Sequence, residues 1–469
     1  MRYPALAIGK NRKNGARGIC SGFGVESMAD VTGNASLATL NQSLPFDPAD
    51  AKAALRELPH AAAVFALFGA EAHAEPYIGR TPNLRARLER LLQPSAKHPR
   101  RLQLAGRVRR IAWRLTGSEF ESLLAQFSLL EEVYGAKALD RMHLGAPTFI
   151  RFLGSNAYPR ITVTNRPSQR EADWAYGPFQ SRVAAERFAD EALKLFLLRR
   201  CTDDLDPNPS HPGCVYSEMK MCLAPCYKGC TDERYREESA AVESFLASRG
   251  ESRLIALKTQ RDEASAQLEF EAAAALHTQV QRVEAVRALA PELVRPLSQL
   301  RAVILQASAN LDEVAVFLYA AGRLRGPAAF STLGMRIQNE QSGSSSLFAQ
   351  PLAIEAIPEE TGISPELAAE MRVEAASESG VATATKIPRG MLESRMEGAL
   401  AALTEAGNAP SATIRQGHLA LLKRWYYRPE IRRAGEIFFP DAEGRWPVKT
   451  MLRGIGRVAA KSMNVAERS

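Results

Sequence analysis

The sequence predicts a multidomain α+β protein, and three observations lead to this expectation. The chain has 469 residues, whereas ordinary domains of about 100 to 200 residues would divide it into about three units. Hydrophobic residues make up 46% of it, which is enough to fold several cores. Short apolar runs typical of strands alternate with stretches in which apolar residues recur at helical spacing.

Charge and hydropathy narrow the functional class. Lys and Arg total 60 against 52 Asp and Glu, and the resulting net charge of +8 suits a phosphate-rich partner without requiring one. The chain lacks the apolar run of about 18 residues that a membrane span needs, and the residues after Met1 lack the apolar core of a signal peptide. We therefore expect a cytoplasmic protein that does not contact a membrane.

The N-terminal part predicts a leader followed by a small domain. Residues 1–45 mix Gly, Asn, Ser and basic residues without periodicity, so we expect a disordered leader or a misassigned start codon. Strands are expected at 61–69, 76–80 and 108–115, with helices at 83–92 and from about Ser118, whose hydroxyl is a helix cap. These elements define a compact α+β unit over residues 55–140.

The remaining chain predicts three further regions. A Cys-rich helical segment is expected over 141–235, with a strand at 158–165 and an amphipathic helix at 181–200. A helical hairpin is expected over 250–290, with two antiparallel helices within 252–287. Residues 298–469 predict an α/β region with strands near 301–323, a Ser/Gly-rich break at 341–346, and helices at 388–406 and 412–424.

Short motifs in the 55–140 unit resemble a nuclease family. AVF at 63–65, YIG at 77–79 and the basic helix beginning NLRAR at 83 are similar to the elements of GIY-YIG endonucleases. The segment TGSEFESLLAQFSLL that follows resembles the next helix of UvrC proteins, and the chain resembles the short Cho-type homologues in particular. The resemblance implies a small antiparallel sheet flanked by helices.

The resemblance also implies roles for individual residues. Cleaving a phosphodiester takes a base, a cation on the phosphate and a metal held by a carboxylate. Tyr77 stands at the family's base, Arg87 at its phosphate-binding arginine, and Arg80 at a usual lysine. Arg87 suits this work because its planar fork bonds two phosphate oxygens at once. Arg85 on the same helix is a further DNA-binding candidate.

The metal-binding position departs from the family pattern. Gln126 stands where the family has a glutamate that holds Mg²⁺ or Mn²⁺, and a neutral amide is a poor ligand for a hard dication. Phe65, Leu91 and Ala138 also replace usual family residues. Glu119 is on the same helix face, but about 10 Å away along the axis. We therefore expect inefficient cleavage or none.

Five of the six cysteines fall between Cys201 and Cys230, which in a reducing compartment favours a metal or cluster over disulfides. Cys201, Cys214, Cys222 and Cys226 resemble the UvrC cysteine segment, including its CLAPC, and the family implies a four-iron four-sulfur cluster there. Four thiolates are also the ligands of a structural zinc, and spacing does not separate the two. Cys230 is an extra thiol, and buried cysteines without a metal are the alternative reading.

The segment 256–283 resembles the UVR motif, whose hairpin docks on a matching hairpin of UvrB. Leu268, Phe270 and Leu276, together with Ala273 and Ala274, are expected to supply the apolar contact surface. The alternative is an ordinary internal hairpin.

The C-terminal region is less informative. Its first strands faintly resemble the second nuclease domain of UvrC, which has an Asp, Asp, His centre. Only two histidines, His277 and His418, occur after residue 250, and no second acidic strand motif is found, so we expect no second incision centre. A basic and aromatic tail could bind DNA by stacking and phosphate contacts through Lys423, Arg424, Trp425 and Tyr426. The alternative is a small core with a basic rim.

Taken together, the sequence indicates a UvrC-like nucleotide excision repair protein that acts on damaged double-stranded DNA with a UvrB-like partner. We favour a non-cleaving DNA- and UvrB-binding factor. The alternative is an active metal-dependent endonuclease that makes the 3′ incision.

Overall fold

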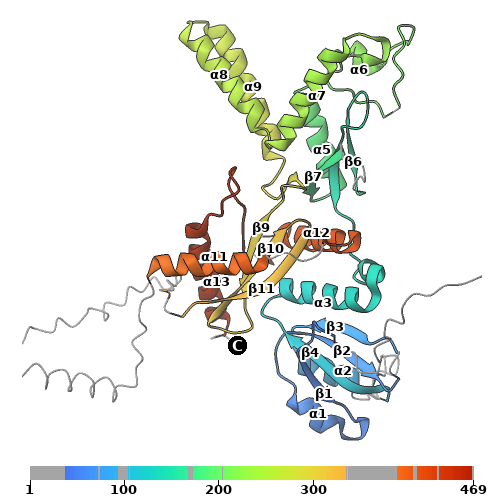
Figure 1. Cartoon of the computed structure of the whole chain (residues 1–469), viewed down its shortest axis with the longest axis vertical. Coiled ribbons are helices and arrows are strands. Elements are labelled where there is room, and N and C mark those ends of the chain that lie inside the picture. Colours follow the sequence, from blue (N-terminus) through green and yellow to red (C-terminus); the bar gives the residue numbers. More distant parts are fainter. Residues whose placement is uncertain are drawn as a thin grey trace, which may run out of the picture.

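The computed structural model describes residues 37–71, 74–92, 104, 106–166, 173–202, 204–333, 335, 388–404, 409–429 and 432–466. Within these ranges the chain forms three four-stranded antiparallel sheets, each with its own helices (Figure 1). The predicted mixed α+β multidomain architecture is confirmed. The Ser/Gly-rich break at 341–346 lies outside the described residues.

The first sheet carries the predicted nuclease-like motifs. Its strand order is β1 (Gln42–Pro45), β4 (Val108–Leu115), β2 (Ala63–Gly69) and β3 (Tyr77–Thr81). Side chains alternate between the two faces of a strand. One face therefore packs on α1 (Ala51–Glu57) and α2 (Leu84–Leu92), and the other on α3 (Glu119–Tyr134). Short 3-10 turns at Pro48–Asp50 and Gly135–Lys137 and helix α4 (Ala138–Arg141) complete this unit.

The predicted leader is too long. Residues 42–45 form β1, which pairs with β4 in the register Gln42↔Trp113, and Leu37 is already buried against the sheet. The sequence QSLP shows no strand alternation, so only pairing with β4 reveals it as a strand. Residues 1–36 of the predicted leader lie outside the described part of the chain.

The middle unit contains a sheet in the order β6 (Ile161–Thr164), β5 (Thr148–Leu153), β7 (Asp173–Phe179) and β8 (Arg295–Pro296). Helices α5 (Arg182–Leu193), α6 (Val215–Glu218) and α7 (Asp232–Ala247) and a 3-10 turn at Pro225–Tyr227 belong to it. The expected helical Cys-rich segment is therefore a mixed α/β unit.

Helix α5 ends earlier than predicted. It stops at Leu193 instead of continuing to residue 200. The backbone N–H of Leu197 donates to Glu238 Oε1 at 2.7 Å, and that of Arg199 donates to the Tyr235 hydroxyl at 3.2 Å. Side chains of α7 thus satisfy backbone groups that would otherwise continue the helix.

The helical hairpin is as expected. Helices α8 (Glu251–Ala266) and α9 (Phe270–Ala288) pack along each other and turn through Leu268, which has a left-handed φ of 62°. Their base joins the core of the middle unit through Leu254, Leu257 and Val283. Figure 1 shows the far end of the hairpin projecting as one of two arms.

The C-terminal sheet has the order β11 (Arg323–Ser331), β10 (Glu313–Ala320), β9 (Ala302–Ala307) and β12 (Glu436–Phe438). Helices α11 (Arg389–Thr404) and α13 (Val448–Ala466) cover one face, whereas α12 (Ala412–Tyr426) and α3 cover the other. The predicted helices at 388–406 and 412–424 are confirmed within a few residues. No helix in the described ranges is long and apolar enough to cross a membrane.

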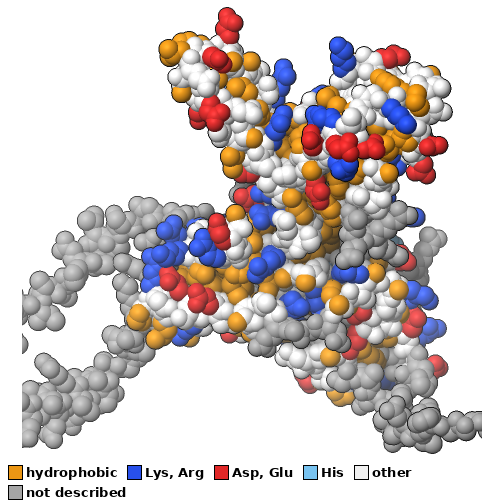
Figure 2. Space-filling view, turned by 45° about the horizontal axis from the view of Figure 1, so that its top comes forward, with side chains coloured by type: hydrophobic (Ala, Val, Ile, Leu, Met, Phe, Trp, Pro, Cys, Tyr) orange, Lys and Arg blue, Asp and Glu red, His pale blue; other side chains and the backbone are white. Residues whose placement is uncertain are grey.

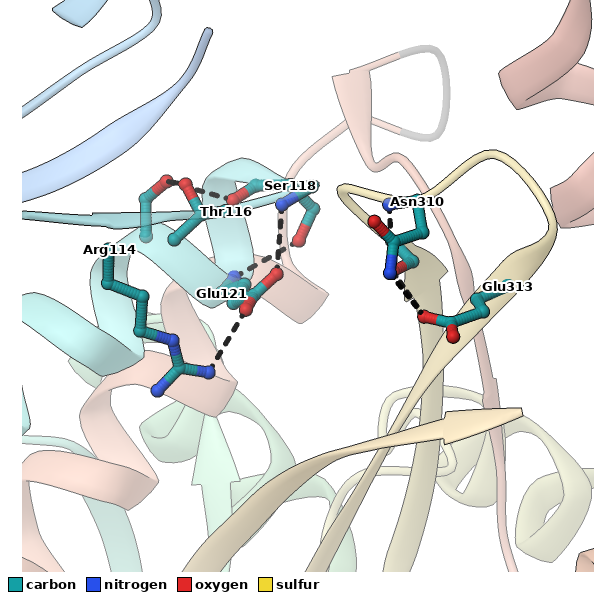
Figure 3. Close-up of polar contacts among 9 residues, drawn as sticks. Arg114, Thr116, Ser118, Glu121, Asn310 and Glu313 are labelled. Carbon is teal, nitrogen blue, oxygen red and sulfur yellow. Dashed lines mark hydrogen bonds and ion pairs between the residues drawn. The ribbon is translucent and has the colours of Figure 1, made fainter. Parts of the chain in front are cut away.

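Helix α3 joins the first and third sheets. Its capping turn lies directly on the β9–β10 turn, where a Cβ added to Gly117 would stand 2.0 Å from the carbonyl carbon of Ser308. Figure 3 shows the hydrogen bonds that shape both turns. Glu121 accepts from the Gly117 N–H at 2.9 Å and from Arg114 at 3.2 Å, while Asn310 donates to Glu313 at 3.0 Å. Burial raises the pKa of the Glu121 carboxyl, and these donors oppose that shift.

Candidate functional site

Tyr77 opens β3, the edge strand of the first sheet, and pairs with Leu67 of β2. Its ring packs beside the fully buried Phe65, with ring centroids 6.2 Å apart. A Cβ added to Gly79 would stand 2.7 Å from the Phe65 ring, so Phe65 fills the space above this glycine. The glycine of the YIG segment therefore has a packing role in the sheet.

The two candidate arginines of α2, Arg85 and Arg87, differ in their contacts. Arg85 donates to the carbonyls of Leu58 at 2.6 Å and Arg56 at 2.5 Å, and so caps the end of α1. Arg87 is half-buried and makes no ion pair within the described part of the chain. Of these two candidates, Arg87 therefore has its guanidinium available for a phosphate, whereas Arg85 bonds to the backbone at the end of α1.

Arg80 lies on the opposite face of β3 from Tyr77, toward α3. Its guanidinium is 3.7 Å from Glu119 Oε1, and Glu119 also accepts two bonds from Arg428, at 2.7 and 2.8 Å. The hydrogen bonds of Arg428 hold the pKa of the Glu119 carboxyl below its usual value, and Arg80 adds to this effect. Burial lowers the pKa of Arg80, and the neighbouring charges of Arg424 and Arg428 lower it further against the opposing influence of Glu119.

Gln126 is half-buried on α3, two helical turns beyond Glu119. Both carboxylates in the first turn of α3 already have cationic or amide partners, Glu119 with Arg428 and Glu121 with Gly117 and Arg114. Across the described residues, no group of three or more His, Cys, Asp or Glu side chains is arranged to hold a metal ion. Gln126 therefore offers an amide at the predicted metal position, and the carboxylates of Glu119 and Glu121 are already engaged by other partners.

Two other departures from the family pattern are packing residues here. Leu91 packs on the core of the first sheet, and Ala138 is fully buried beneath α3. Both positions contribute apolar contacts, and neither side chain can bind an anion or a metal.

The cysteine loop connects α5 to α7. Cys214 caps α6, Cys226 lies in the 3-10 turn, and the Ala224 N–H donates to Cys222 Sγ at 3.3 Å. Ala224 has a left-handed φ of 56°, which is uncommon for a residue with a side chain and shows that the loop is tightly constrained.

Four of the five loop cysteines influence one another's thiol pKa. The pKa of the Cys222 thiol is raised to about 11, mainly by burial and to a smaller extent by the nearby Cys201, Cys214 and Cys226. For Cys230, burial and the Asp232 carboxylate raise the thiol pKa. The four predicted ligands therefore lie near one another, and Cys230 lies near a different charge. Four thiolates are the donor set that an iron-sulfur cluster or a structural zinc takes, so their chemistry fits either group.

The hairpin tip exposes part of its predicted contact surface. Leu268 is 72% exposed and Phe270 is 66% exposed, while Leu276 packs against the core of the middle unit. Figure 2 shows hydrophobic side chains gathered at the end of the arm that α8 and α9 form. The tip thus presents an apolar surface to solvent.

The C-terminal tail is mainly part of a core. Trp425 is 2% exposed, its ring lies 5.4 Å from Phe120, and its Nε1 donates to the Ala434 carbonyl at 3.2 Å. Tyr426 is half-buried beneath Arg433, whose guanidinium carbon is 5.3 Å from the ring centroid. Trp425 therefore belongs to a small core, as the alternative interpretation expects. Its buried ring is not available to stack on a base.

The basic residues of the tail differ in exposure. Lys423 is half-buried, and burial lowers the pKa of its amine, whereas Arg424 is exposed. Arg424 is therefore the member of the predicted DNA-binding set in the tail that reaches solvent most freely.

Sequence reasoning missed two features of these surfaces. The bond between Glu119 and Arg428 joins residues 309 positions apart, and no local pattern predicts it. A cavity of about 630 Å³ lies between α5, α8 and α9, and a smaller one of about 330 Å³ lies beside Tyr176 and Arg249. The basic residues that line the larger cavity come from three helices, so only the fold brings them together.

Comparison with known proteins gives a family match in the middle part of the described structure and several similar proteins. A family model described as the UvrC/Cho excinuclease middle domain matches residues 149–245, which include the cysteine loop. The chain is 31% identical over 211 residues to UvrABC system protein C of Alcanivorax borkumensis, which covers 45% of this chain and 34% of that protein.

Two further relatives give similar values. The proteins of the same name from Ruminiclostridium cellulolyticum and Pseudomonas aeruginosa are 29% and 27% identical, over 50% and 49% of this chain and 38% of each relative. The chain thus aligns with little more than a third of the length of these curated relatives. No solved structure matches the chain.

Proposed function

The chain belongs to the UvrC family, and from this premise we propose that it acts in nucleotide excision repair, on damaged double-stranded DNA and with a UvrB-like partner. The matched middle domain, the exposed apolar tip of the hairpin and the net charge of +8 support this proposal. In this role the first sheet and its helices form a GIY-YIG-like unit, and the hairpin corresponds to a UVR motif.

Within that role we propose that the protein binds DNA and its partner without cutting efficiently. The observation that carries this proposal is the state of α3, where Gln126 replaces a carboxylate and Arg428 engages both oxygens of Glu119. A hard dication recruits anionic oxygen, and an amide is a weak substitute. The DNA-binding surface would then include Arg87 and Arg424.

One observation favours the alternative of an active 3′ endonuclease. Tyr77 and Arg87 are both partly exposed, and Arg87 makes no ion pair in the described ranges, as a phosphate-binding arginine requires. In that case Tyr77 would accept the proton of the attacking water, Arg87 would neutralise charge on the phosphate, and Mg²⁺ or Mn²⁺ would act as the Lewis acid.

An incision assay separates the two functions. We expect the full chain with a UvrB-like protein and Mg²⁺ or Mn²⁺ to bind an end-labelled lesion duplex without cutting it. Gln126→Glu should restore 3′ incision, while Gln260→Glu on the exposed surface of α8, which adds the same charge, should not. Incision by the unaltered protein that is lost in Tyr77→Phe would establish the enzyme instead.

We also propose that Cys201, Cys214, Cys222 and Cys226 hold a four-iron four-sulfur cluster, with zinc as the alternative metal. Their mutual electrostatic influence and the amide donated to Cys222 support this assignment. When bound, the cluster would cross-link the loop between α5 and α7.

Metal analysis tests the cysteine proposal. Protein purified without oxygen should contain iron and sulfide and absorb visible light, whereas a zinc protein would be colourless. Cys222→Ser should lose the metal and Cys230→Ser should keep it. Retention of the metal in Cys222→Ser would contradict the proposed ligand set.

A further inference from the structure

Positive charge is concentrated in the larger cavity, which is a groove between α5, α8 and α9. Its volume of about 630 Å³ lies within the range of about 300 to 1,000 Å³ that is typical of ligand sites. Three helices contribute cations to it, namely Arg187 of α5, Lys194 at the end of α5, Arg253 of α8 and Arg282 of α9. Glu191 is the one carboxylate among its described lining residues.

Most of this positive charge is not neutralised within the protein. Lys194 pairs with Glu191 at 2.7 Å. Arg187, Arg253 and Arg282 make no ion pair within the described part of the chain, and Arg253 lies 5.7 Å from the ring centroid of Phe196. Like charges that converge on one cavity repel each other, so an anionic occupant would stabilise this arrangement.

The apolar floor of the cavity is already covered by the core of the middle unit. Leu257, Val283 and Val286 are each at most 5% exposed. These three side chains offer an amphipathic peptide little further area to bury, and the cations around them favour an anionic occupant. The described lining residues include no aromatic side chain on which a base could stack.

We propose that this groove holds the phosphate backbone of a DNA strand, independently of sequence. Arg187 and Lys194 are seven residues apart, which corresponds to about 10 Å along α5. Over that length of duplex axis, one strand presents about three phosphates. Guanidinium groups bond phosphate oxygens in pairs, and contacts of this kind position a protein on DNA without reading its bases. This inference rests on the proposed function, because it requires that the chain acts on DNA.

The test is a salt titration of DNA affinity with the full chain. Binding of a fluorescein-labelled single strand and of the same sequence as a duplex is followed by anisotropy. For the triple variant Arg187→Gln/Arg253→Gln/Arg282→Gln we expect an affinity loss of at least roughly tenfold at low salt. The slope of log affinity against log salt should fall by about two for the single strand, since each lost phosphate contact removes about 0.7.

A matched control has the same change of charge on the same part of the molecule. Arg182, Arg236 and Arg261 on α5, α7 and α8 each pair with a neighbouring carboxylate, so Arg182→Gln/Arg236→Gln/Arg261→Gln should keep the affinity and the slope. Replacement of the three groove arginines by lysine keeps the charge, so most of the salt slope should remain. If the glutamine variant lost affinity only because the site tolerates no substitution, the lysine variant would lose it as well.

The possible outcomes separate this inference from the proposed function. If the unaltered protein binds no DNA, the proposed function fails and this inference fails with it. If the unaltered protein binds but the groove and control triples bind equally, only the groove proposal is overturned. A polyglutamate peptide that binds the groove while the DNA slope stays unchanged would likewise overturn it in favour of an acidic protein segment.

Discussion

Helix α3 and the α8–α9 hairpin differ in what covers them. Both α3 and α8 contain 16 residues, and the sequence patterns of both regions predict helices. α3 is covered by the first sheet through Ala125 and Leu129 and by the C-terminal core through Phe120 and Phe127. Among the described residues, the hairpin packs on the middle unit through its base, at Leu254, Leu257 and Val283.

This difference shows how the same type of element serves two purposes. The helix that carries Gln126 contributes to two hydrophobic cores, so its surface mainly holds domains together. The hairpin keeps Leu268 and Phe270 in solvent, although burying them would be favourable. An exposed apolar tip of this kind is available to a partner protein.

The largest expected effect comes from Phe127→Ala. Phe127 is 1% exposed, and its ring lies 5.4 Å from that of His418 in the joint between α3 and α12. Loss of the ring should lower the free energy of unfolding by about 3 to 5 kcal/mol, measured by denaturant titration. Val183→Ala on α5, where the side chain is 73% exposed, is the control and should change it by less than about 0.5 kcal/mol. A small loss for Phe127→Ala would show that α3 is not part of a shared core.

Gly117→Ala should have the next largest effect. The new Cβ would meet the backbone of Ser308 and Ala309, which cannot move aside as a flexible side chain can. We expect a loss of about 1 to 3 kcal/mol in unfolding free energy and faster proteolysis between the first and third sheets. Gly106→Ala, which meets no atom within 4 Å, should be tolerated. Equal behaviour of the two variants would contradict the close contact.

Glu119→Gln should cost about 0.2 to 1 kcal/mol at neutral pH, because the pair with Arg428 is partly exposed to solvent. The pKa of Glu119 is lower in the folded protein than its ordinary value of 4.5. The stabilisation is therefore complete above pH 4.5 and is lost as the pH falls through the lower, folded-state value. Denaturation of both proteins at pH 7 and in acid should show a difference that shrinks in acid. A difference that grows in acid would rule out this pair as its source. Glu186→Gln in the pair on α5 is the control for a bond within one helix.

The smallest effect on stability is expected for Leu268→Ser combined with Phe270→Ser. Both side chains are exposed, so the unfolding free energy should change by less than about 1 kcal/mol in total. Affinity for a UvrB-like protein, measured by calorimetry, should instead fall at least roughly tenfold. Ile255→Ser, a 57% exposed apolar position on α8, should leave the affinity unchanged. A loss of stability without a loss of affinity would instead show that the tip packs inside the protein.

Local sequence signals predicted much of the fold, and distant contacts account for the rest. Strand β4 was predicted with its observed bounds, and Ser118 caps α3 through a bond from the Glu121 N–H at 3.1 Å, since both depend on neighbouring residues. Strand β1, the early end of α5 and the burial of Trp425 depend on distant segments. The pairing Gln42↔Trp113, the bond from Leu197 to Glu238 and the contact of Trp425 with Phe120 span 71, 41 and 305 residues. No local pattern records such partners.

The strand and the helix that carry Tyr77 and Arg87 were predicted, whereas the roles of these residues stay predictions. The positions of Tyr77 and Arg87 beside the first sheet follow from the motifs, but whether they catalyse a reaction stays a prediction. Alternation along β3 already implies that Tyr77 and Arg80, three positions apart, lie on opposite faces. The pairing of Glu119 with Arg428 and the basic cavity required the tertiary structure.

The long interval between α3 and its covering helix has a consequence for synthesis. At about 5 to 20 residues per second, the 309 residues from Glu119 to Arg428 take about 15 to 60 seconds to translate. During that interval the nascent chain displays Phe120, Leu123 and Phe127 without α12 to shield them. The ribosome-bound intermediate is thus a natural client for chaperones, and a fragment truncated after α3 should be prone to aggregate.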